Sequence, residues 1–422
     1  MIDIKLIREN PKLVKESQRK RNLPERIIDD LLNLDKEWRK TKEEADDLRS
    51  ERNKISLQIN EFKKEKKDIS QLIKRAKEIP ERLKQLEETE NELGSKSKGL
   101  LLNLPNIIDK SVPIGDASKN KVLKEYGKKQ KYKFKIKGHE ELLKDLDLLD
   151  LEKASQVSGA RFYYLKGDMA RLNYAIINFA KDFLSKKRFT FIQPPYMLNR
   201  QALSCAITLA TFEDTIYKIE NEDLYLIGTA EHALNAYYMN ETIDAKKLPI
   251  RFFGISPCFR KEAGAHGKDT KGIFRVHQFD KIEQFVFCRP ENSWKEFELI
   301  LNNTTSMFKM LGIPFRSVTL SSGDTGIVAS KTIDLEGWFP VQNAYRELAS
   351  CSNVLDYQAR RGNIKYVEND EKKLVHTLNN TAIATQRMLA CMVENFQQKD
   401  GSIKIPKVLH KYAGFKIIKA KQ

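Results

Sequence analysis

The sequence has 422 residues, which is too long for one ordinary hydrophobic core and fits two or three domains. Its 75 Lys and Arg residues outnumber 58 Asp and Glu residues, and the net charge of +17 favours a polyanionic partner such as nucleic acid. A lysine-rich surface that serves only solubility is the alternative. No apolar run approaches the roughly 18 residues of a membrane span, and the N-terminus has no apolar export signal. We therefore exclude a membrane-spanning protein and expect a cytoplasmic one.

Five cysteines are scattered along the chain, at positions 205, 258, 288, 351 and 391. They form no CxxC pair and no His/Cys spacing suited to zinc. We expect reduced, packed thiols, with neither a disulfide framework nor a zinc site.

Two heptad series follow each other in the N-terminal region. Steps of three and four run through positions 31, 34, 38, 41, 45, 48, 52, 55, 59 and 62, and again through 69, 72, 76, 79, 83, 86, 90, 93, 97 and 100. Two long helices can bury these stripes against each other, and the short polar segment 63–68 makes them an antiparallel hairpin. Asp68 or Ser70 is suited to cap the returning helix, and Pro80 predicts a kink or break near residues 77–79.

The expected tip of the hairpin is basic. It carries Lys63, Lys64, Lys66 and Lys67, interrupted only by Glu65. This composition indicates a probe for a phosphate backbone. A dimerisation coiled coil or a solvated spacer is the alternative, because residues 1–110 hold 27 basic and 23 acidic side chains and are nearly balanced in charge.

A basic linker is expected at residues 109–140, after the heptads end. Residues 119–137 contain nine lysines and one glutamate, with two tyrosines and a phenylalanine between them. Contact with a nucleic-acid backbone and a simple exposed strand or loop are equally good interpretations.

The remainder, residues 141–422, reads as a mixed helix and strand domain. It has a helical period at residues 169–184, strand-like runs at 224–227, 250–255 and 279–287, and four clusters suited to chemistry. Residues 225–232 end a strand with Thr229 and Glu231, which can receive a ligand ammonium or can simply cap a helix. Residues 259–283 form a strand, a Gly-rich basic loop and a second strand, an arrangement suited to triphosphate. The GxxxxGK[ST] and GxGxxG patterns are absent, which excludes a P-loop and a Rossmann fingerprint.

The other two clusters add two candidate metal ligands and an arginine. Glu347 and Ser350 could hold Mg²⁺ between phosphates. Arg387 begins a mostly apolar helix, where an arginine is costly to bury unless an anion meets it. Together the clusters predict a nucleotide site.

These clusters resemble, in order, the motifs of a class II aminoacyl-tRNA synthetase, specifically those of the seryl-tRNA synthetase family. FRKEAGAHGKDTKGIFRVHQFDKIE resembles the second motif, ELASCSN followed by YQARR the strand before the third, and HTLNNTAIATQR with ENFQQKDGSIKIP the third. MIDIKLIRENP resembles the family's N-terminus and VSGARFYYLKG its entry to the catalytic domain. The resemblance covers essentially the whole chain and is closest to the archaeal-like type with a metal-free serine site.

The resemblance implies an α+β protein. An N-terminal tRNA-binding domain, residues 1–108, would carry the antiparallel coiled-coil hairpin. A class II catalytic domain, residues 141–422, would hold an antiparallel sheet flanked by helices and form a homodimer through a first motif that includes Pro194 and Pro195. The implied activity is serine–tRNA ligation: serine and ATP give seryl-adenylate, and the seryl group passes to the 3′ end of tRNA(Ser), or of tRNA(Sec) where present.

The resemblance also implies roles for single residues. Arg260, Glu347 and Arg387 would be catalytic. Serine would be bound by Thr229, Ala230, Glu231, Arg260, Glu283, Asn379 and Thr381. ATP would be bound by Arg260, Lys261, Glu262, Val276, Phe279, Glu347, Leu348, Ala349, Ser350 and Arg387. Mg²⁺ would be held by Glu347 and Ser350, and zinc would not be needed.

Two other classes of protein fit parts of the sequence. One is a synthetase-like RNA-binding or regulatory protein without aminoacylation activity, for which loss of Arg260, Glu283, Glu347 or Arg387 would be the sign. The other is an enzyme that loads an amino acid onto a carrier protein and lacks a long tRNA-binding arm. All four residues and the arm are present, which favours the ligase.

Overall fold

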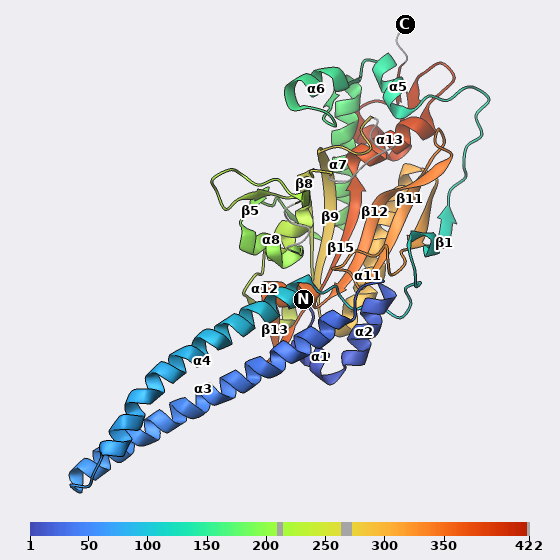
Figure 1. Ribbon diagram of the computed structural model, residues 1–422. Helices are drawn as coiled ribbons and strands as arrows, with labels where there is room; N and C mark the ends of the chain where they lie inside the picture. Colours follow the sequence, from blue (N-terminus) through green and yellow to red (C-terminus); the bar gives the residue numbers. More distant parts are fainter. Residues whose placement is uncertain (209–213, 263–271, 420–422) are drawn as a thin grey trace. The chain divides into compact units, whose positions relative to one another are not determined.

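The structure is a computed structural model that describes residues 1–208, 214–262 and 272–419 (Figure 1). The basic loop expected between the two strands of the second motif falls largely outside these ranges. The chain divides into two compact units, Ile2–Leu104 and Pro105–Gln422 with Met1. Among the described residues no helix is both long enough and apolar enough to cross a membrane.

The N-terminal unit consists of four helices. They are α1 (Ile4–Glu9), α2 (Pro11–Lys20), α3 (Arg26–Lys64) and α4 (Ser70–Asn103). Asp3 caps α1 through the Lys5 amide, and Asn10 caps α2, which begins with a proline whose missing amide hydrogen is not needed there. At 1.5 Å per residue α3 and α4 extend roughly 58 Å and 51 Å.

The predicted heptad hairpin is confirmed. The helices α3 and α4 run antiparallel, and every position of both heptad series is buried or half-buried except Arg52, which is exposed. Ala45, Leu83 and Leu86 form a buried cluster between the helices. Exposed ion pairs such as Arg49–Glu87, at 2.8 Å, flank the apolar stripe and contribute little beyond register.

The predicted helix cap at the turn and the predicted break at Pro80 concern separate parts of the hairpin: the first concerns Asp68 and Ser70, and the second the middle of α4. The N-cap of α4 is Ile69, which makes no side-chain capping bond, while Asp68 just before it accepts the Ser70 amide hydrogen at 2.9 Å. The helix then continues through Pro80 without a break. Ile79 and Leu83 on either side of the proline are buried against α3, and this packing compensates for the missing backbone hydrogen bond.

The larger unit is built on an eight-stranded sheet with the order β1-β10-β11-β12-β15-β9-β8-β4. All neighbours are antiparallel except β4 and β8. The bounds are β1 (Lys121–Tyr126), β4 (Thr190–Ile192), β8 (Ile250–Phe259), β9 (Gln278–Cys288), β10 (Phe315–Thr319), β11 (Lys331–Phe339), β12 (Ala344–Leu355) and β15 (His376–Ala384). The predicted strands at 250–255 and 279–287 are therefore confirmed, and part of the expected linker forms the edge strand β1.

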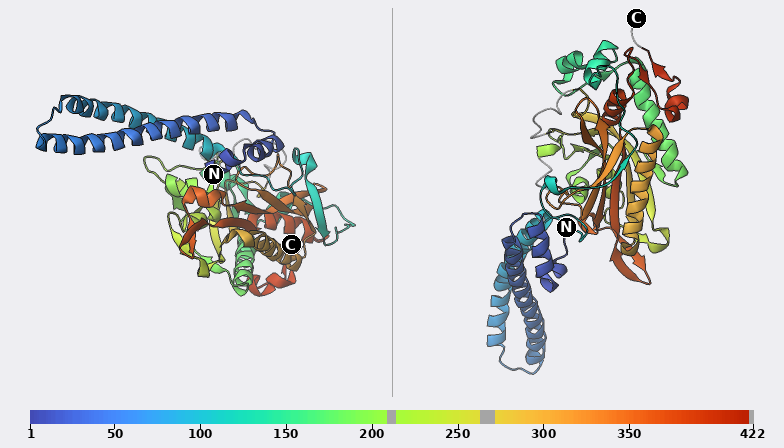
Figure 2. Two further views of the ribbon diagram at one scale, coloured as in Figure 1. Left: turned by 90° about the horizontal axis from the view of Figure 1, so that it is seen from below. Right: turned by 90° about the vertical axis from the view of Figure 1, so that its right-hand side faces the viewer.

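Two long helices, α7 (Gly167–Lys186) and α11 (Ser293–Leu311), lie along one face of this sheet (Figure 2). The main core lies between them and the sheet, with Phe179, Phe297 and Phe308 among its buried side chains. The helix α7 matches the helical period predicted at 169–184. Because one face is filled by these helices, a ligand site can form only on the other.

Shorter elements surround the sheet. The helices are α5 (His139–Asp145), α6 (Leu151–Ser158), α8 (Arg200–Ala206), α10 (Ala230–Ala236), α12 (Tyr357–Gly362), α13 (Thr385–Phe396) and α14 (His410–Ala413). The strands are β2 (Leu149–Asp150), β3 (Tyr164–Leu165), β5 (Met197–Leu198), β6 (Tyr225–Leu226), β7 (Thr242–Asp244), β13 (Lys365–Glu368), β14 (Glu371–Leu374), β16 (Ile403–Lys404) and β17 (Ile417–Ile418). Of these, α10 and α13 bring residues to the open face of the sheet.

Candidate active site

The open face of the sheet is lined by alternate residues of its central strands. On β9, Phe279, Lys281 and Glu283 are spaced by two and all border cavities on this face. On β15, Asn379 and Thr381 do the same. This follows from the period of two along a strand, which sends every second side chain to the same side.

A bulge in β12 places Glu347 and Ser350 on the open face together. Residues three apart in a regular strand would face opposite sides. The pairing of β12 with β11 shifts by one residue at Leu348, so that Leu348 and Ala349 are both buried at 1% and 2% exposure. Glu347 and Ser350 thereby both border the second cavity described below.

Gly337 on β11 makes room for this bulge. A Cβ at this position would lie 2.4 Å from Leu348 Cδ1 and 3.0 Å from Cys391 Sγ. The absence of a side chain lets Leu348 pack against the strand, and a larger residue would push the bulge outward.

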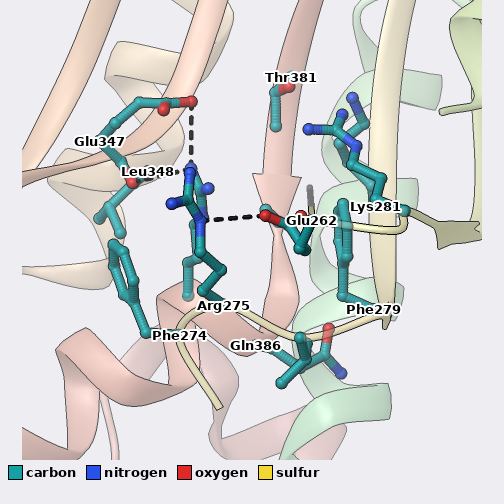
Figure 3. Close-up of a pocket in the computed structure, with 13 residues that line it drawn as sticks. Glu262, Phe274, Arg275, Phe279, Lys281, Glu347, Leu348, Thr381 and Gln386 are labelled. Carbon is teal, nitrogen blue, oxygen red and sulfur yellow. Dashed lines mark hydrogen bonds and ion pairs between the residues drawn. The ribbon is translucent and has the colours of Figure 1, made fainter. Parts of the chain in front are cut away.

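The first cavity is shown in Figure 3. Three arginines meet there. Arg275 pairs with Glu262 at 3.0 Å, and Arg387 pairs with Glu347 at 3.1 Å. The residues that line it are Arg260, Glu262, Phe274, Arg275, Val276, Phe279, Lys281, Glu347, Leu348, Thr381, Ala384, Gln386 and Arg387. Two aromatic rings and three guanidinium groups make this cavity suited to a planar base and phosphates.

Arg260 is held by its neighbours at the end of β8. Its Nε donates to the Gly228 carbonyl at 3.1 Å, and its guanidinium lies 5.3 Å from the Phe279 ring. The side chain borders both cavities. At the opposite wall the Arg387 guanidinium lowers the pKa of Glu347, so that carboxylate is ionised at neutral pH.

The second cavity adjoins the first and shares Arg260, Lys281, Glu347 and Thr381 with it. It contains the buried carboxylate of Glu283, which is 1% exposed. Lys281 pairs with Glu283 Oε2 at 2.6 Å, and the hydroxyls of Thr229 and Thr381 donate to the same oxygen at 3.2 Å and 3.4 Å. This cluster is suited to a small polar ligand.

Glu231 is a second, half-buried carboxylate of this cavity. Burial, and then the nearby Glu283, raise its pKa from 4.5 to about 7. Gln358 Nε2 and Asn379 Nδ2 donate to its Oε1 at 2.8 Å and 3.1 Å, which fixes the side chain. A ligand ammonium would favour the ionised form.

Thr229 combines the two roles that the sequence left open. It is the N-cap of α10, where its Oγ1 accepts the Glu231 amide hydrogen at 3.2 Å. The same hydroxyl donates to Glu283. Helix capping and site formation therefore use one side chain.

Most residues implied by the family resemblance lie at these two cavities. Four do not border either: Thr229 is buried behind Glu283, Ala230 is fully buried in α10, Lys261 is exposed, and Ala349 belongs to the core on the other face of β12. Phe274, Arg275, Lys281, Ala384 and Gln386 line the first cavity and are not among the residues expected from the sequence. Phe279 and Glu283 are four residues apart on one strand, so the period of two places Lys281, midway between them, on the same face. This was a signal that could have added Lys281.

Phe274 and Arg275 are held in place by residues outside the second motif. The Ile273 amide donates to His139 Nε2 at 3.4 Å, and His139 Nδ1 lies 3.0 Å from Glu394 Oε1 in α13. Gly272 has φ +67°, and a Cβ there would lie 2.3 Å from His139 Nε2. The buried His–Glu pair thus fixes the chain directly before the cavity-lining residues.

Comparison with known proteins now identifies the class and then the family. Residues 212–396 match the core domain of class II tRNA synthetases (G, H, P, S and T), so the larger unit contains a class II aminoacyl-tRNA synthetase core. Residues 1–108 match the seryl-tRNA synthetase N-terminal domain. The serine–tRNA ligase of Nitrosopumilus maritimus is 47% identical over 98% of this chain and 99% of its own.

Solved structures agree with this result. The seryl-tRNA synthetase from Pyrococcus horikoshii complexed with ATP has 45% identity and a TM-score of 0.96 over the whole of both chains. The cytoplasmic serine-tRNA ligase from Naegleria fowleri in complex with AMP has 38% identity and a TM-score of 0.89, over 100% of this chain and 99% of that one. The chain belongs to the seryl-tRNA synthetase family, and the family and the α+β fold class predicted from the sequence are confirmed.

Proposed function

We propose that the two adjoining cavities carry out the serine–tRNA ligase reaction of the family, with ATP in the first and serine in the second. The observation that supports this most is the position of Arg260, which borders both cavities. A cation at their junction would lie beside the α-phosphate, where the two substrates must react. Serine-dependent exchange of labelled pyrophosphate into ATP tests the proposal.

ATP would place its base against Phe279 and Val276, near Glu262. Its phosphates would meet the guanidinium groups of Arg260, Arg275 and Arg387, which bind phosphoryl oxygens through paired N–H groups. Lys261, Leu348 and Ala349 would contribute through their backbone or through long-range charge, since Lys261 is exposed and the other two side chains are buried.

Serine would place its ammonium at Glu231 and the Thr229–Ala230 segment. Its hydroxyl would reach Glu283 and Thr381, with Asn379 beside them. Alanine would leave the Glu283 carboxylate without one hydrogen-bond partner, and a buried polar group left unpaired rejects the smaller substrate strongly.

The donor set of Glu347 and Ser350 fits Mg²⁺. Both side chains offer hard oxygen atoms on one face of β12, and Mg²⁺ in nucleotide sites takes one or two carboxylates and completes its shell with phosphates and water. Among the described residues no group of three or more His, Cys, Asp or Glu side chains could hold a metal ion by itself, so the phosphates would have to complete the site. When bound, Mg²⁺ would neutralise phosphate charge.

The chemistry requires positioning and charge rather than a strong base. A serine carboxylate oxygen attacks the α-phosphorus, the bond to the β-phosphate oxygen breaks, and pyrophosphate leaves. The 3′-hydroxyl of the tRNA then attacks the seryl carbonyl carbon, and AMP leaves. Arg260 would hold the α-phosphate in both steps, and fixed charges that match the developing charge lower the barrier without reorganisation.

The raised pKa of Glu231 predicts a pH dependence. Serine binds the ionised carboxylate, so kcat/KM for serine should rise roughly tenfold between pH 6 and 8, as expected for a group titrating near 7. Stability should change in the opposite direction: because burial raises this pKa, the contribution of Glu231 to the free energy of unfolding falls as pH rises from 4.5 through 7. The measurement is serine-dependent exchange across this range. Glu231→Gln should lower the value at pH 8 and remove the rise; a rise that persists in this variant would contradict the role of Glu231.

We also propose that residues 1–108 form the tRNA-binding domain, residues 109–140 a basic connection and residues 141–422 the catalytic domain. The hairpin would contact tRNA(Ser), or tRNA(Sec) where present, through the phosphate backbone at its lysine-rich tip. The cytoplasm, where ATP and tRNA are abundant, is the proposed location.

A homodimer would form at the edge strand β4 and the helix α7, where Tyr174 and Phe191 expose large apolar side chains, at 67% and 42%.

The tip lysines give a separate prediction. Changing all four of them to alanine should weaken tRNA binding and lower the slope of log Kd against log salt by about 1 for each lysine that binds a phosphate. The measurement is tRNA binding at several salt concentrations. A matched control changes four exposed lysines of the larger unit, Lys404, Lys407, Lys411 and Lys416. An unchanged slope for the tip variant, or an equally weakened control, would contradict binding of RNA by the tip.

A further inference from the structure

Asp334 is a buried acidic residue on the floor of the second cavity. It lies in the middle of β11, is 8% exposed, and borders the cavity together with Thr332 and Glu336. It pairs in register directly opposite Ser350 of β12, the neighbouring strand in Figure 1. Directly opposite residues of antiparallel strands have Cβ atoms about 4.5 to 5.5 Å apart. Asp334 and the proposed metal residue Ser350 therefore lie on one face at short range.

Each of the other acidic residues that border this cavity has a protein partner: Glu283 pairs with Lys281, Glu231 accepts from Gln358 and Asn379, and Asp324 accepts from Asn120. Glu336 pairs with Arg316 at 2.5 Å, and Glu347 pairs with Arg387 at 3.1 Å. For Asp334 no ion pair with any described Lys, Arg or His is found, and its buried Oδ1 has no hydrogen-bond partner. Burial, and then the nearby Glu347, raise the pKa of Asp334, and a hydrogen bond with Ser350 offsets only part of this rise.

A buried carboxylate oxygen without a partner normally costs stability. Leaving a buried acceptor unsatisfied costs about 1 to 3 kcal/mol, and more when the group is charged. Such residues concentrate where a ligand completes them. A divalent cation is the ligand that fits here, because it would meet oxygen atoms of Asp334, Glu347 and Ser350 on a single face.

We propose that Asp334 is a third oxygen ligand, direct or through one metal-bound water, of the divalent cation held by Glu347 and Ser350. This inference rests on the proposed ATP and Mg²⁺ site. Two carboxylates and a hydroxyl leave the remaining positions of an octahedral shell to phosphate oxygens and water, as Mg²⁺ prefers. The second carboxylate would offset the positive charge that Mg²⁺ and three arginines bring to one small volume.

The test uses the full-length protein with Mn²⁺ as the probe. ATP affinity is measured by calorimetry without serine, once in EDTA and once in saturating Mn²⁺, and the ratio of the two Kd values is the metal-dependent gain. Asp334→Asn should reduce this gain about tenfold, which is the usual effect of removing a metal-site partner. In EDTA its ATP affinity should equal or exceed that of the wild type, because one negative charge is removed. Its Tm should stay equal or rise, because the unfavourable burial of a carboxyl beside Glu347 is removed.

The control is Asp324→Asn. Asp324 also borders the second cavity, but its Oδ2 accepts from Asn120 Nδ2 at 2.7 Å, so it has a protein partner. This variant should keep the wild-type metal-dependent gain.

The outcomes separate the inference from the proposal on which it rests. If the metal-dependent gain in ATP affinity of the Asp334→Asn variant equals that of the wild type, the role of Asp334 is overturned and the Mg²⁺ site of Glu347 and Ser350 stands. An equal decrease of ATP affinity with and without Mn²⁺, with a lower Tm, would assign Asp334 a structural role and also overturn the inference. A wild-type protein without any metal-dependent gain would contradict the proposed Mg²⁺ site itself.

Discussion

Replacing Arg260 by alanine is expected to reduce serine-dependent pyrophosphate exchange by at least about 10³-fold, since removal of one fixed donor from a reacting centre already costs about 10² to 10³ and this donor is charged. Arg260 borders both cavities, and the Gly228 carbonyl and the Phe279 ring hold its guanidinium in place. Arg260→Lys keeps the charge but lacks the planar fork, so its rate should lie between those of the wild type and the alanine variant.

A suitable control is Arg171→Ala. Arg171 lies on α7, where it pairs with Asp168 at 2.8 Å, and it borders neither cavity. Its exchange rate should match the wild type. Normal exchange by Arg260→Ala would contradict the assignment of Arg260 to the α-phosphate.

Shortening the hairpin should separate the two half-reactions. Replacement of residues 49–82 by a short glycine-rich turn keeps the cluster of Ala45, Leu48, Leu83 and Leu86, so the base of the hairpin retains its packing. We expect tRNA charging to fall by roughly 10³-fold, as expected when several lysine–phosphate interactions are removed. Pyrophosphate exchange should stay at the wild-type rate, because the N-terminal unit and the larger unit are separately compact.

The two activities are measured on the same preparation, so each controls for the other. Full charging by the shortened protein would show that the distal hairpin is not needed for tRNA. Loss of both activities would show instead that the hairpin supports the catalytic unit.

The fold could be predicted where one periodicity governs a long segment. The heptads of α3 and α4 specify nearly every seam position because only packing between two helices acts on them. The break predicted near Pro80 does not occur. The cost of a proline in a helix is local, and the buried Ile79 and Leu83 near it hold α4 against α3. Residues 121–126 form an exposed edge strand, one of the interpretations that the sequence left open, because their backbone pairs with β10.

The site could be predicted in kind but not in geometry. Family motifs supplied Glu347 and Ser350, yet a period of two would send them to opposite faces, and only the bulge at Leu348 brings them together. Lys281 follows from the alternation along β9 and could have been found from the sequence. Asp334 depends on the register of β11 with β12, and Arg275 lies in the segment before β9, next to the residues that His139 holds. A single sequence does not specify these two placements, because they depend on the assembled domain.

The central claim, that this chain activates serine with ATP, is tested most directly by pyrophosphate exchange without tRNA in the presence of serine, alanine, threonine or cysteine. We expect exchange with serine alone, as for the serine–tRNA ligases of the family, and Glu283 and Thr381 offer hydrogen bonds to a hydroxyl that alanine and cysteine lack. Absence of exchange with all four amino acids would contradict the account and favour a synthetase-like protein with a regulatory or RNA-binding role.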